Sequence, residues 1–159
     1  MITEFKEEYC WLSNFHPCKI ILNNLEYPSV EHAYQSAKSN DIEWKKYCQN
    51  SNNYAGKIKI NSKNIIKHKD WEDHKITIMY LCLIQKFEQE PFKTKLIQTK
   101  HERIKEGNNW GDKFWGIDIK TSRGENVLGR LIEKIRTKLI QEKNGKSKNT
   151  TKEKFSISE

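Results

Sequence analysis

The stretch Tyr27–Lys38, which reads YPSVEHAYQSAK, constrains the fold of this chain more than any other segment. It predicts a helix with a defined start. Pro28 restricts the entry, and Ser29 is a good N-cap, because its hydroxyl can accept a hydrogen bond from an N–H group of the first turn. At about 100° per residue the helix carries an apolar flank. That flank consists of Val30, Ala33, Tyr34 and Ala37.

Three polar side chains of the same helix share one face. Glu31, Gln35 and Lys38 stand at i, i+4 and i+7, so they align over two turns. Two interpretations are open. Such a row is usually a solvated face, since charged side chains prefer water. If another segment covers the helix, the same row becomes the floor of a pocket.

Charge and composition narrow the class of protein. The chain has 159 residues, a formal charge of +8, and four cysteines without C-x-x-C spacing. The length suits one domain with a core, and the charge favours anionic partners such as phosphorylated small molecules, nucleotides or nucleic acid. No disulfide framework, metal site or cofactor is expected. No leader and no membrane-spanning run is evident, so we expect a cytoplasmic protein without a membrane partner.

Periodicity and turn residues predict the other elements. Short β-prone runs flank Asn23-Asn24 and predict a hairpin that leads into the Tyr27–Lys38 helix. Further helices are expected over 42–48 with Asp41 as cap, near 54–57, from an Asp70 cap to Pro91, and over 92–99. A last helix follows Asn126, and Trp11 and Phe15 are expected to pack inward. The predicted fold is therefore α+β, mainly helical, with a short N-terminal hairpin.

The segment 105–116, KEGNNWGDKFWG, lacks the periodicity of a helix or strand that would form part of the core framework. Its aromatic residues interrupt a Gly/Asn-rich, non-periodic loop, whereas loops usually lie on the surface. These rings either pack back onto the core or form a wall on which a flat base stacks, and Asp112 is equally readable as a turn residue. From 142 on, the chain is polar and lysine-rich, so we expect a domain over 1–141 and a disordered tail over 142–159.

These motifs together resemble the NADAR (YbiA-like) family. The resemblance rests on LSNF at 12–15, the Tyr27–Lys38 stretch, Asp70-Trp71 leading a helix that ends in Lys86-Phe87, WGD at 110–112, Trp115-Gly116 and GENVLG at 124–129. It covers roughly 5–139. The resemblance implies a compact single domain of α+β fold and an N-glycosidase, an enzyme that hydrolyses a base–ribose bond.

The resemblance also implies the site. The functional positions of the family would correspond here to Asn14, Glu31, Lys38, Trp71, Trp110 and Asp112. We expect Glu31 as general acid/base, Asp112 to position water or ribose hydroxyls, and Lys38 either to bind phosphate or to attack the opened sugar aldehyde. Trp71 is open to a second interpretation as a packed residue at a helix start. The full set of expected substrate-binding residues is Asn14, Phe15, His32, Gln35, Trp71, Trp110, Gly111, Trp115, Asn126 and Gly129, with no metal ligand.

The substrate and partners stay open at this level. The charge favours removal of ADP-ribose from modified guanine in nucleic acid, because phosphate contacts dominate such binding. The alternative substrate is an early riboflavin-pathway intermediate, a ribosyl phosphate. A non-catalytic module that binds ADP-ribose or nucleic acid is the alternative of another class. The expected partner is a ribosyl or ADP-ribosyl molecule, alone or carried on DNA or RNA, bound by a monomer or weak oligomer.

Overall fold

A β-hairpin runs directly into the helix that carries the polar row. The computed structural model describes the backbone of residues 1–155 and the side chains of residues 1–146. Strands β1 (Pro17–Leu22) and β2 (Leu25–Ser29) pair antiparallel, and Asn23 and Asn24, with φ of 49° and 63°, make the tight turn between them. Helix α1 (Val30–Ser36) begins at the next residue, and the Ser29 side chain accepts from the His32 N–H. The predicted hairpin and N-cap are confirmed.

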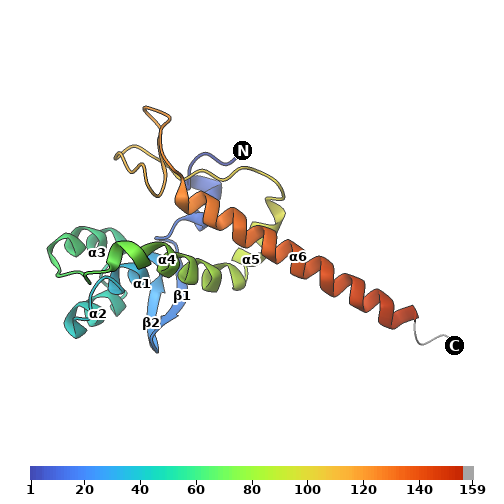
Figure 1. Ribbon diagram of the computed structural model, residues 1–159, viewed down its shortest axis with the longest axis horizontal. Helices are drawn as coiled ribbons and strands as arrows, with labels where there is room; N and C mark the ends of the chain where they lie inside the picture. The colour runs from blue at the N-terminus through green and yellow to red at the C-terminus, as the bar shows by residue number, and fades with distance from the viewer. Residues whose placement is uncertain (156–159) are drawn as a thin grey trace. The chain divides into compact units, whose positions relative to one another are not determined.

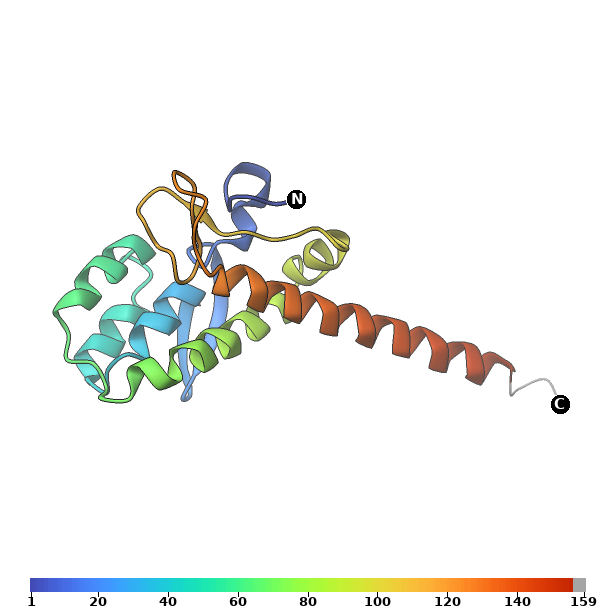
Figure 2. The same ribbon diagram turned by 45° about the horizontal axis from the view of Figure 1, so that its top comes forward.

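The hairpin and α1 belong to the first of two compact units, which spans Glu4–Phe92. Its other elements are η1 (Glu7–Leu12), α2 (Ile42–Gln49), α3 (Ala55–Asn61), η2 (Ser62–Asn64) and α4 (Trp71–Glu88). Helix α1 contacts the hairpin and α2, α3 and α4 (Figure 2). Every side chain of α1 is therefore buried. Fully buried apolar side chains on α1 and on the elements around it include Leu12, Ile20, Val30, Ala33, Ile58 and Leu83.

Two local predictions in this unit are not fully confirmed. Asp70 occupies the N-cap position of α4 as expected, but its side chain makes no capping hydrogen bond and its carboxylate pairs instead with His74 one turn later at 2.8 Å. Phe15 is 45% exposed, whereas Trp11 is buried as expected. A dense aromatic segment therefore has only part of its rings in the core.

The second unit consists of Met1–Thr3 and the chain from Lys93 onward. Helix α5 (Phe92–Gln98) leads into it, the two-residue strands β3 (Gly107–Asn108) and β4 (Ile117–Asp118) pair parallel, and α6 (Val127–Phe155) is its long helix (Figure 1). Ile2 forms a parallel bridge with Ile104. The buried side chains here include Ile2, Leu96, Ile104, Ile132 and Ile135.

The mainly helical α+β class with an N-terminal hairpin is confirmed. Helix α6 extends to Phe155, whereas the sequence predicts a disordered tail over 142–159; residues 156–159 lie outside the described residues. The boundary between 141 and 142 stays a prediction. None of the described helices combines the length and the apolar character needed to cross a membrane.

Candidate active site

Glu31 is a buried carboxylate at the centre of the first unit. Its side chain is 5% exposed although α1 is only two turns long. The Gln35 side-chain amide donates to Glu31 Oε1 at 2.6 Å, one turn further along the helix. The Glu31 backbone N–H donates to the carbonyl of Asn14 at 3.0 Å, which joins the loop after η1 to the start of α1. For Glu31 and Gln35, the interpretation as a solvated face is therefore wrong.

Two amide oxygens near this carboxylate have no hydrogen-bond partner within the described residues. They are Gln35 Oε1 and Asn14 Oδ1, and the two side chains are 3% and 9% exposed. Each amide nitrogen is already engaged, that of Gln35 on Glu31 and that of Asn14 on the Met79 sulfur at 3.5 Å. Buried polar atoms are normally paired, and leaving one unpaired costs about 1–3 kcal/mol. These oxygens are suited to accept hydrogen bonds from a ligand.

Lys38 follows α1 and is half-buried among aromatic rings. Its Nζ lies 5.4 Å from the Tyr34 ring centre and 5.9 Å from that of Trp71. Burial, followed by the positive charge of Lys67, lowers the pKa of Lys38 to about 8, while Glu31 acts in the opposite direction. A lysine with this pKa has a substantial neutral fraction near pH 8, as a nucleophilic amine requires.

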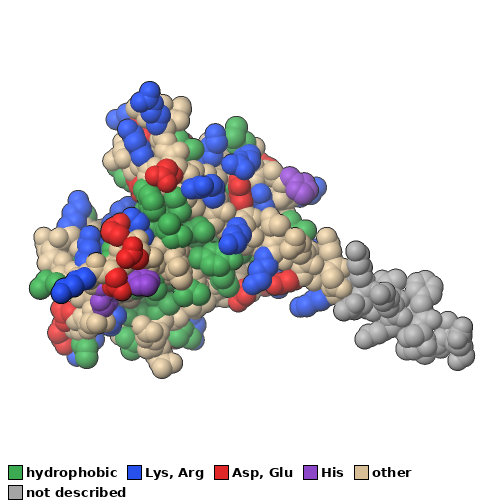
Figure 3. Space-filling model, viewed as in Figure 1, with side chains coloured by type: hydrophobic (Ala, Val, Ile, Leu, Met, Phe, Trp, Pro, Cys, Tyr) green, Lys and Arg blue, Asp and Glu red, His purple; other side chains and the backbone are tan. Residues whose placement is uncertain are grey.

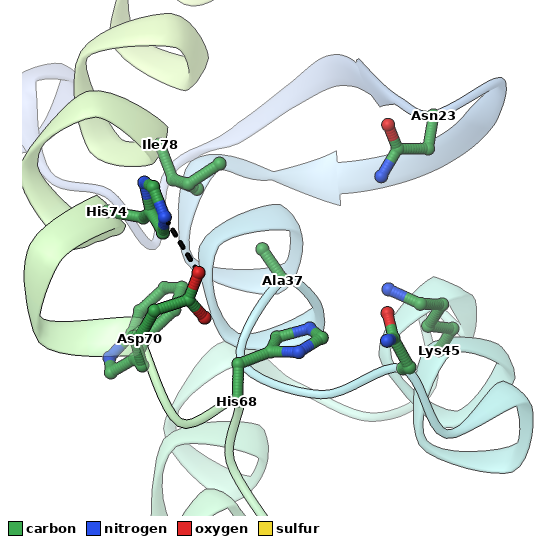
Figure 4. Close-up of a pocket in the computed structure, with 9 residues that line it drawn as sticks. Asn23, Ala37, Lys45, His68, Asp70, His74 and Ile78 are labelled. Carbon is green, nitrogen blue, oxygen red and sulfur yellow. Dashed lines mark hydrogen bonds and ion pairs between the residues drawn. The ribbon is translucent and has the colours of Figure 1, made fainter.

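The rings around Lys38 form a packed group. Trp71 is 5% exposed and its ring centre lies 5.2 Å from that of Tyr34. Trp71 also lines a cavity of about 260 Å³. The other lining residues, most of them labelled in Figure 4, are Asn23, Ala37, Asn40, Lys45, His68, Asp70, His74 and Ile78. The ring is thus packed, as its structural interpretation expects. The hollow that it borders is not lined by Glu31, Gln35 or Lys38, so a ligand contact of Trp71 stays a prediction.

Two other predicted contacts of this unit differ in their surroundings. The His32 ring is enclosed, because Nε2 donates to the Asn53 carbonyl at 2.7 Å and Nδ1 accepts from the Ser29 hydroxyl. Burial lowers the pKa of His32, in keeping with a neutral ring that fixes the start of α1. Phe15 presents its ring beside Lys59, whose Nζ lies 6.0 Å from the ring centre.

Asp112 organises the loop of the second unit. Its Oδ1 accepts from the backbone N–H groups of Phe114 and Trp115 at 3.0 and 2.9 Å. The side chain of Asn108 bonds both the N–H and the carbonyl of Asp112. Asp112 is thus a turn residue in this structure, with one carboxylate oxygen committed to the loop.

The loop aromatics divide into exposed and half-buried rings. Trp110 is 61% exposed beside Gly111, whose φ of 82° favours glycine. Phe114 and Trp115 are half-buried and meet edge to face at 4.9 Å. Trp110 therefore has the exposure that a stacking surface requires, whereas Phe114 and Trp115 pack on each other.

Asn126 and Gly129 hold the chain's own backbone. Asn126 Oδ1 accepts from the Glu106 N–H and its Nδ2 donates to the Ile104 carbonyl, both at 2.9 Å. A Cβ on Gly129 would stand 2.2 Å from that same carbonyl oxygen. Gly129 is thus packed against the chain's own backbone, and its expected contact with substrate stays a prediction.

The predicted site residues fall into two groups. The first unit brings together Asn14, Glu31, Gln35, Lys38 and Trp71, with Phe15 and His32 nearby in sequence, and the second unit holds Trp110, Gly111, Asp112, Trp115, Asn126 and Gly129. A pocket formed by both groups stays a prediction. The sequence analysis did not predict that the charges of Lys59 and Lys67 lower the pKa of Lys38. Their distance from Lys38 along the chain gives no indication of this effect.

The chain is similar to known proteins in sequence and in fold. The NADAR domain family matches residues 2–140. The N-glycosidase YbiA of Shigella boydii is 29% identical over 140 residues, 86% of either chain. A riboflavin biosynthesis protein of Vibrio vulnificus is 30% identical over 135 residues, and the chain spans 36% of its length. An NMR structure of the Escherichia coli protein YbiA has a TM-score of 0.77 at 25% identity, covering 89% of this chain and 84% of that one.

Relatives named as N-glycosidases over 86% of the chain, together with the matching α+β fold, define an enzyme of the N-glycosidase class. Within that class, this chain belongs to the NADAR domain family.

Proposed function

We propose that this enzyme hydrolyses the bond between a base and the ribose of an ADP-ribosyl or ribosyl-phosphate group. The observation that carries this proposal is the buried Glu31 carboxylate, held by Gln35 and accompanied by two unpaired amide oxygens. Base–ribose cleavage builds positive charge on the sugar, which a carboxylate stabilises. The amide oxygens accept hydrogen bonds from the sugar hydroxyls.

Glu31 supplies the proton chemistry. The protonated carboxyl gives its proton to the departing base nitrogen as the bond from C1′ to that nitrogen breaks. The resulting carboxylate then takes a proton from the water that adds to C1′, so Glu31 ends in its starting state. Gln35 donates to one carboxylate oxygen throughout and fixes the rotamer.

Lys38 has two candidate roles. Its ammonium form binds a substrate phosphate as a point charge. Its neutral form attacks the C1′ aldehyde of the ring-opened sugar, where loss of water leaves an imine that a second water hydrolyses to release the sugar and the free amine. The pKa of about 8 allows both forms near neutrality. Borohydride reduction during turnover distinguishes them, because only attack on the sugar leaves a stable adduct on Lys38 for mass spectrometry. Asp112 is proposed to position water or ribose hydroxyls.

The preferred substrate is ADP-ribose attached to guanine in nucleic acid, since a formal charge of +8 suits a polyanion. A ribosylaminopyrimidine phosphate is the second candidate. It is favoured by the relatives of Vibrio vulnificus and Arabidopsis thaliana, which are named riboflavin biosynthesis proteins.

The test is a paired incubation of both substrates with wild type, Glu31→Gln and the control Glu43→Gln, read by mass spectrometry. Glu43 is an exposed acid on α2, so its substitution leaves turnover intact. Glu31→Gln keeps the size and the acceptor for Gln35 but is expected to lower turnover by about 10²–10⁴-fold. Cleavage in only one tube identifies the substrate. Cleavage in neither, or full activity of Glu31→Gln, overturns the proposal.

A further inference from the structure

The start of α3 exposes aromatic rings to solvent. Tyr54, the residue before α3, is 66% exposed, and Phe15 is 45% exposed. A Cβ on Gly56 would lie 3.2 Å from the Tyr54 ring and 3.8 Å from that of Phe15, so both rings flank this glycine. Large exposed rings of this kind are typical of contact surfaces.

Lysines are frequent in the segment that carries Tyr54, and the first acidic residue after it is Asp70. The segment 49–69 contains five lysines and no Asp or Glu, whereas the whole chain has 29 basic and 21 acidic residues. Lys59 Nζ lies over the Phe15 ring, and Lys63, one turn further, is exposed. Figure 3 shows basic side chains over the α3 region at the left of the view. We call Phe15, Tyr54, Lys59, Lys63 and Lys67 the aromatic–lysine surface.

This surface borders the candidate active site. The charges of Lys67 and Lys59 both lower the pKa of Lys38, while the acids Glu31 and Glu72 act on it in the opposite direction. Helix α3 also contacts α1, which carries Glu31. A polymer bound along these lysines would therefore present one of its units beside Lys38.

We propose that the aromatic–lysine surface binds single-stranded nucleic acid and so delivers the base to be cleaved, an inference that rests on the proposed function. Lysines neutralise phosphates, and exposed rings stack unpaired bases. An enzyme acting on a base also needs that base out of a duplex stack. A membrane surface fits less well, since the seven residues of α3 offer no extended apolar face.

The charge test uses fluorescence anisotropy with an unmodified oligodeoxythymidine of about twelve nucleotides, so no turnover is needed. The variant Lys59→Glu, Lys63→Glu, Lys67→Glu is compared with Lys134→Glu, Lys138→Glu, Lys143→Glu on α6, which makes the same change in net charge. For the first variant we expect at least a tenfold loss of affinity and a salt slope shallower by about two, since each single-strand phosphate contact contributes roughly 0.7. The α6 variant keeps most of the wild-type slope.

The stacking test uses Tyr54→Ala, with Ile60→Ala as control because Ile60 is 61% exposed on the same helix. Tyr54→Ala is expected to weaken binding roughly 5- to 150-fold with an unchanged salt slope. Ile60→Ala leaves affinity within about twofold.

Three outcomes overturn the inference: no wild-type binding to the strand, equal losses in the two triple variants, or tight binding to vesicles with anionic headgroups that exceeds binding to the strand. Cleavage of a small ribosyl substrate is measured separately. If the wild type cleaves this substrate but does not bind the strand, the proposed function stands and the strand-binding role of the surface is wrong. If the strand binds in the expected pattern but no substrate is cleaved, the surface stands and the proposed function is wrong.

Discussion

The Lys86 ammonium donates to the backbone carbonyl of Ser13 at 2.7 Å from a fully buried position. Its Nζ lies 5.4 and 5.2 Å from the ring centres of Phe87 and Phe92, and no carboxylate among residues 1–146 forms an ion pair with it. Burial lowers the pKa of Lys86 to about 8. Ser13 precedes Asn14, whose carbonyl accepts from Glu31, so this lysine holds the loop beside the candidate site at a cost in stability.

Replacing Lys86 with Met is expected to raise the free energy of unfolding at pH 7 by roughly 1–2 kcal/mol. A fall in pKa from 10.5 to about 8 corresponds to about 3 kcal/mol, which is partly offset by the lost hydrogen bond to Ser13. Between pH 8 and 10.5 the Lys86 side chain binds more protons in the unfolded wild type than in the folded form. The free energy of unfolding of the wild type therefore rises with pH in this range, whereas the variant lacks this contribution. The advantage of Lys86→Met over wild type should therefore shrink towards pH 10. Urea unfolding at pH 7 and pH 10 measures this, with Lys75→Met on the same helix as control, and a large loss at pH 7 contradicts it.

Reversing the charge at position 67 with Lys67→Glu should raise the pKa of Lys38. Lys67 is the largest charge contribution that lowers this pKa, so Lys67→Glu removes a repulsion and adds an attraction for the ammonium. The pH–rate profile should move its limb near pH 8 to higher pH. Lys69→Glu is the matched control, being an exposed lysine two residues away that is not among the charges acting on Lys38. Equal profiles for wild type and Lys67→Glu would mean that this limb does not report Lys38.

Gln35→Met tests the unpaired amide oxygens. This substitution keeps the side-chain length but removes both the donor to Glu31 and the oxygen that lacks a partner. We expect kcat/KM for a ribosyl substrate to fall at least tenfold, and the preference of the wild type for ribosyl over 2′-deoxyribosyl substrate to diminish. Gln98→Met, at an exposed position of α5, should change neither quantity. A variant that is slower but equally selective would show that Gln35 acts only through its hydrogen bond to Glu31, and not through a contact with the sugar.

Gly129→Ala is expected to destabilise the second unit by about 2 kcal/mol or more. The added Cβ would lie 2.2 Å from the Ile104 carbonyl oxygen, so backbone must move. Gly145→Ala on the same helix meets nothing within 4 Å and should be neutral or stabilising by up to about 1 kcal/mol, because alanine favours helix. Thermal unfolding of the two variants is the measurement, and similar midpoints would refute the argument.

Local signals account for what the sequence predicts well. Ser29, the Asn23-Asn24 turn and Asp41 act on neighbouring backbone, so the hairpin, α1 and α2 follow from a few residues. The Asp70 side chain does not cap α4 in this way, and its carboxylate pairs with His74 one turn away instead. A local pattern does not reveal which of two available partners is preferred.

Burial of the polar row on α1 required tertiary information. Glu31 and Gln35 have the spacing of a solvated face, and only packing against other elements encloses them. The same holds for Lys38, whose pKa depends on Lys67, nearly thirty positions away. The roles of the site residues in the second unit stay predictions from the family resemblance.

Ser29 takes part in two hydrogen-bonding patterns at once. It pairs with Pro17 in the hairpin register, and it caps α1 at the following residue. No loop residue separates strand from helix, whereas hinges are loop or terminal positions that absorb changes in φ and ψ. The hairpin and α1 should therefore exchange their amide hydrogens as one cooperative block. Glu31, two residues after Ser29, should then exchange its amide hydrogen with this block rather than with the loops around it.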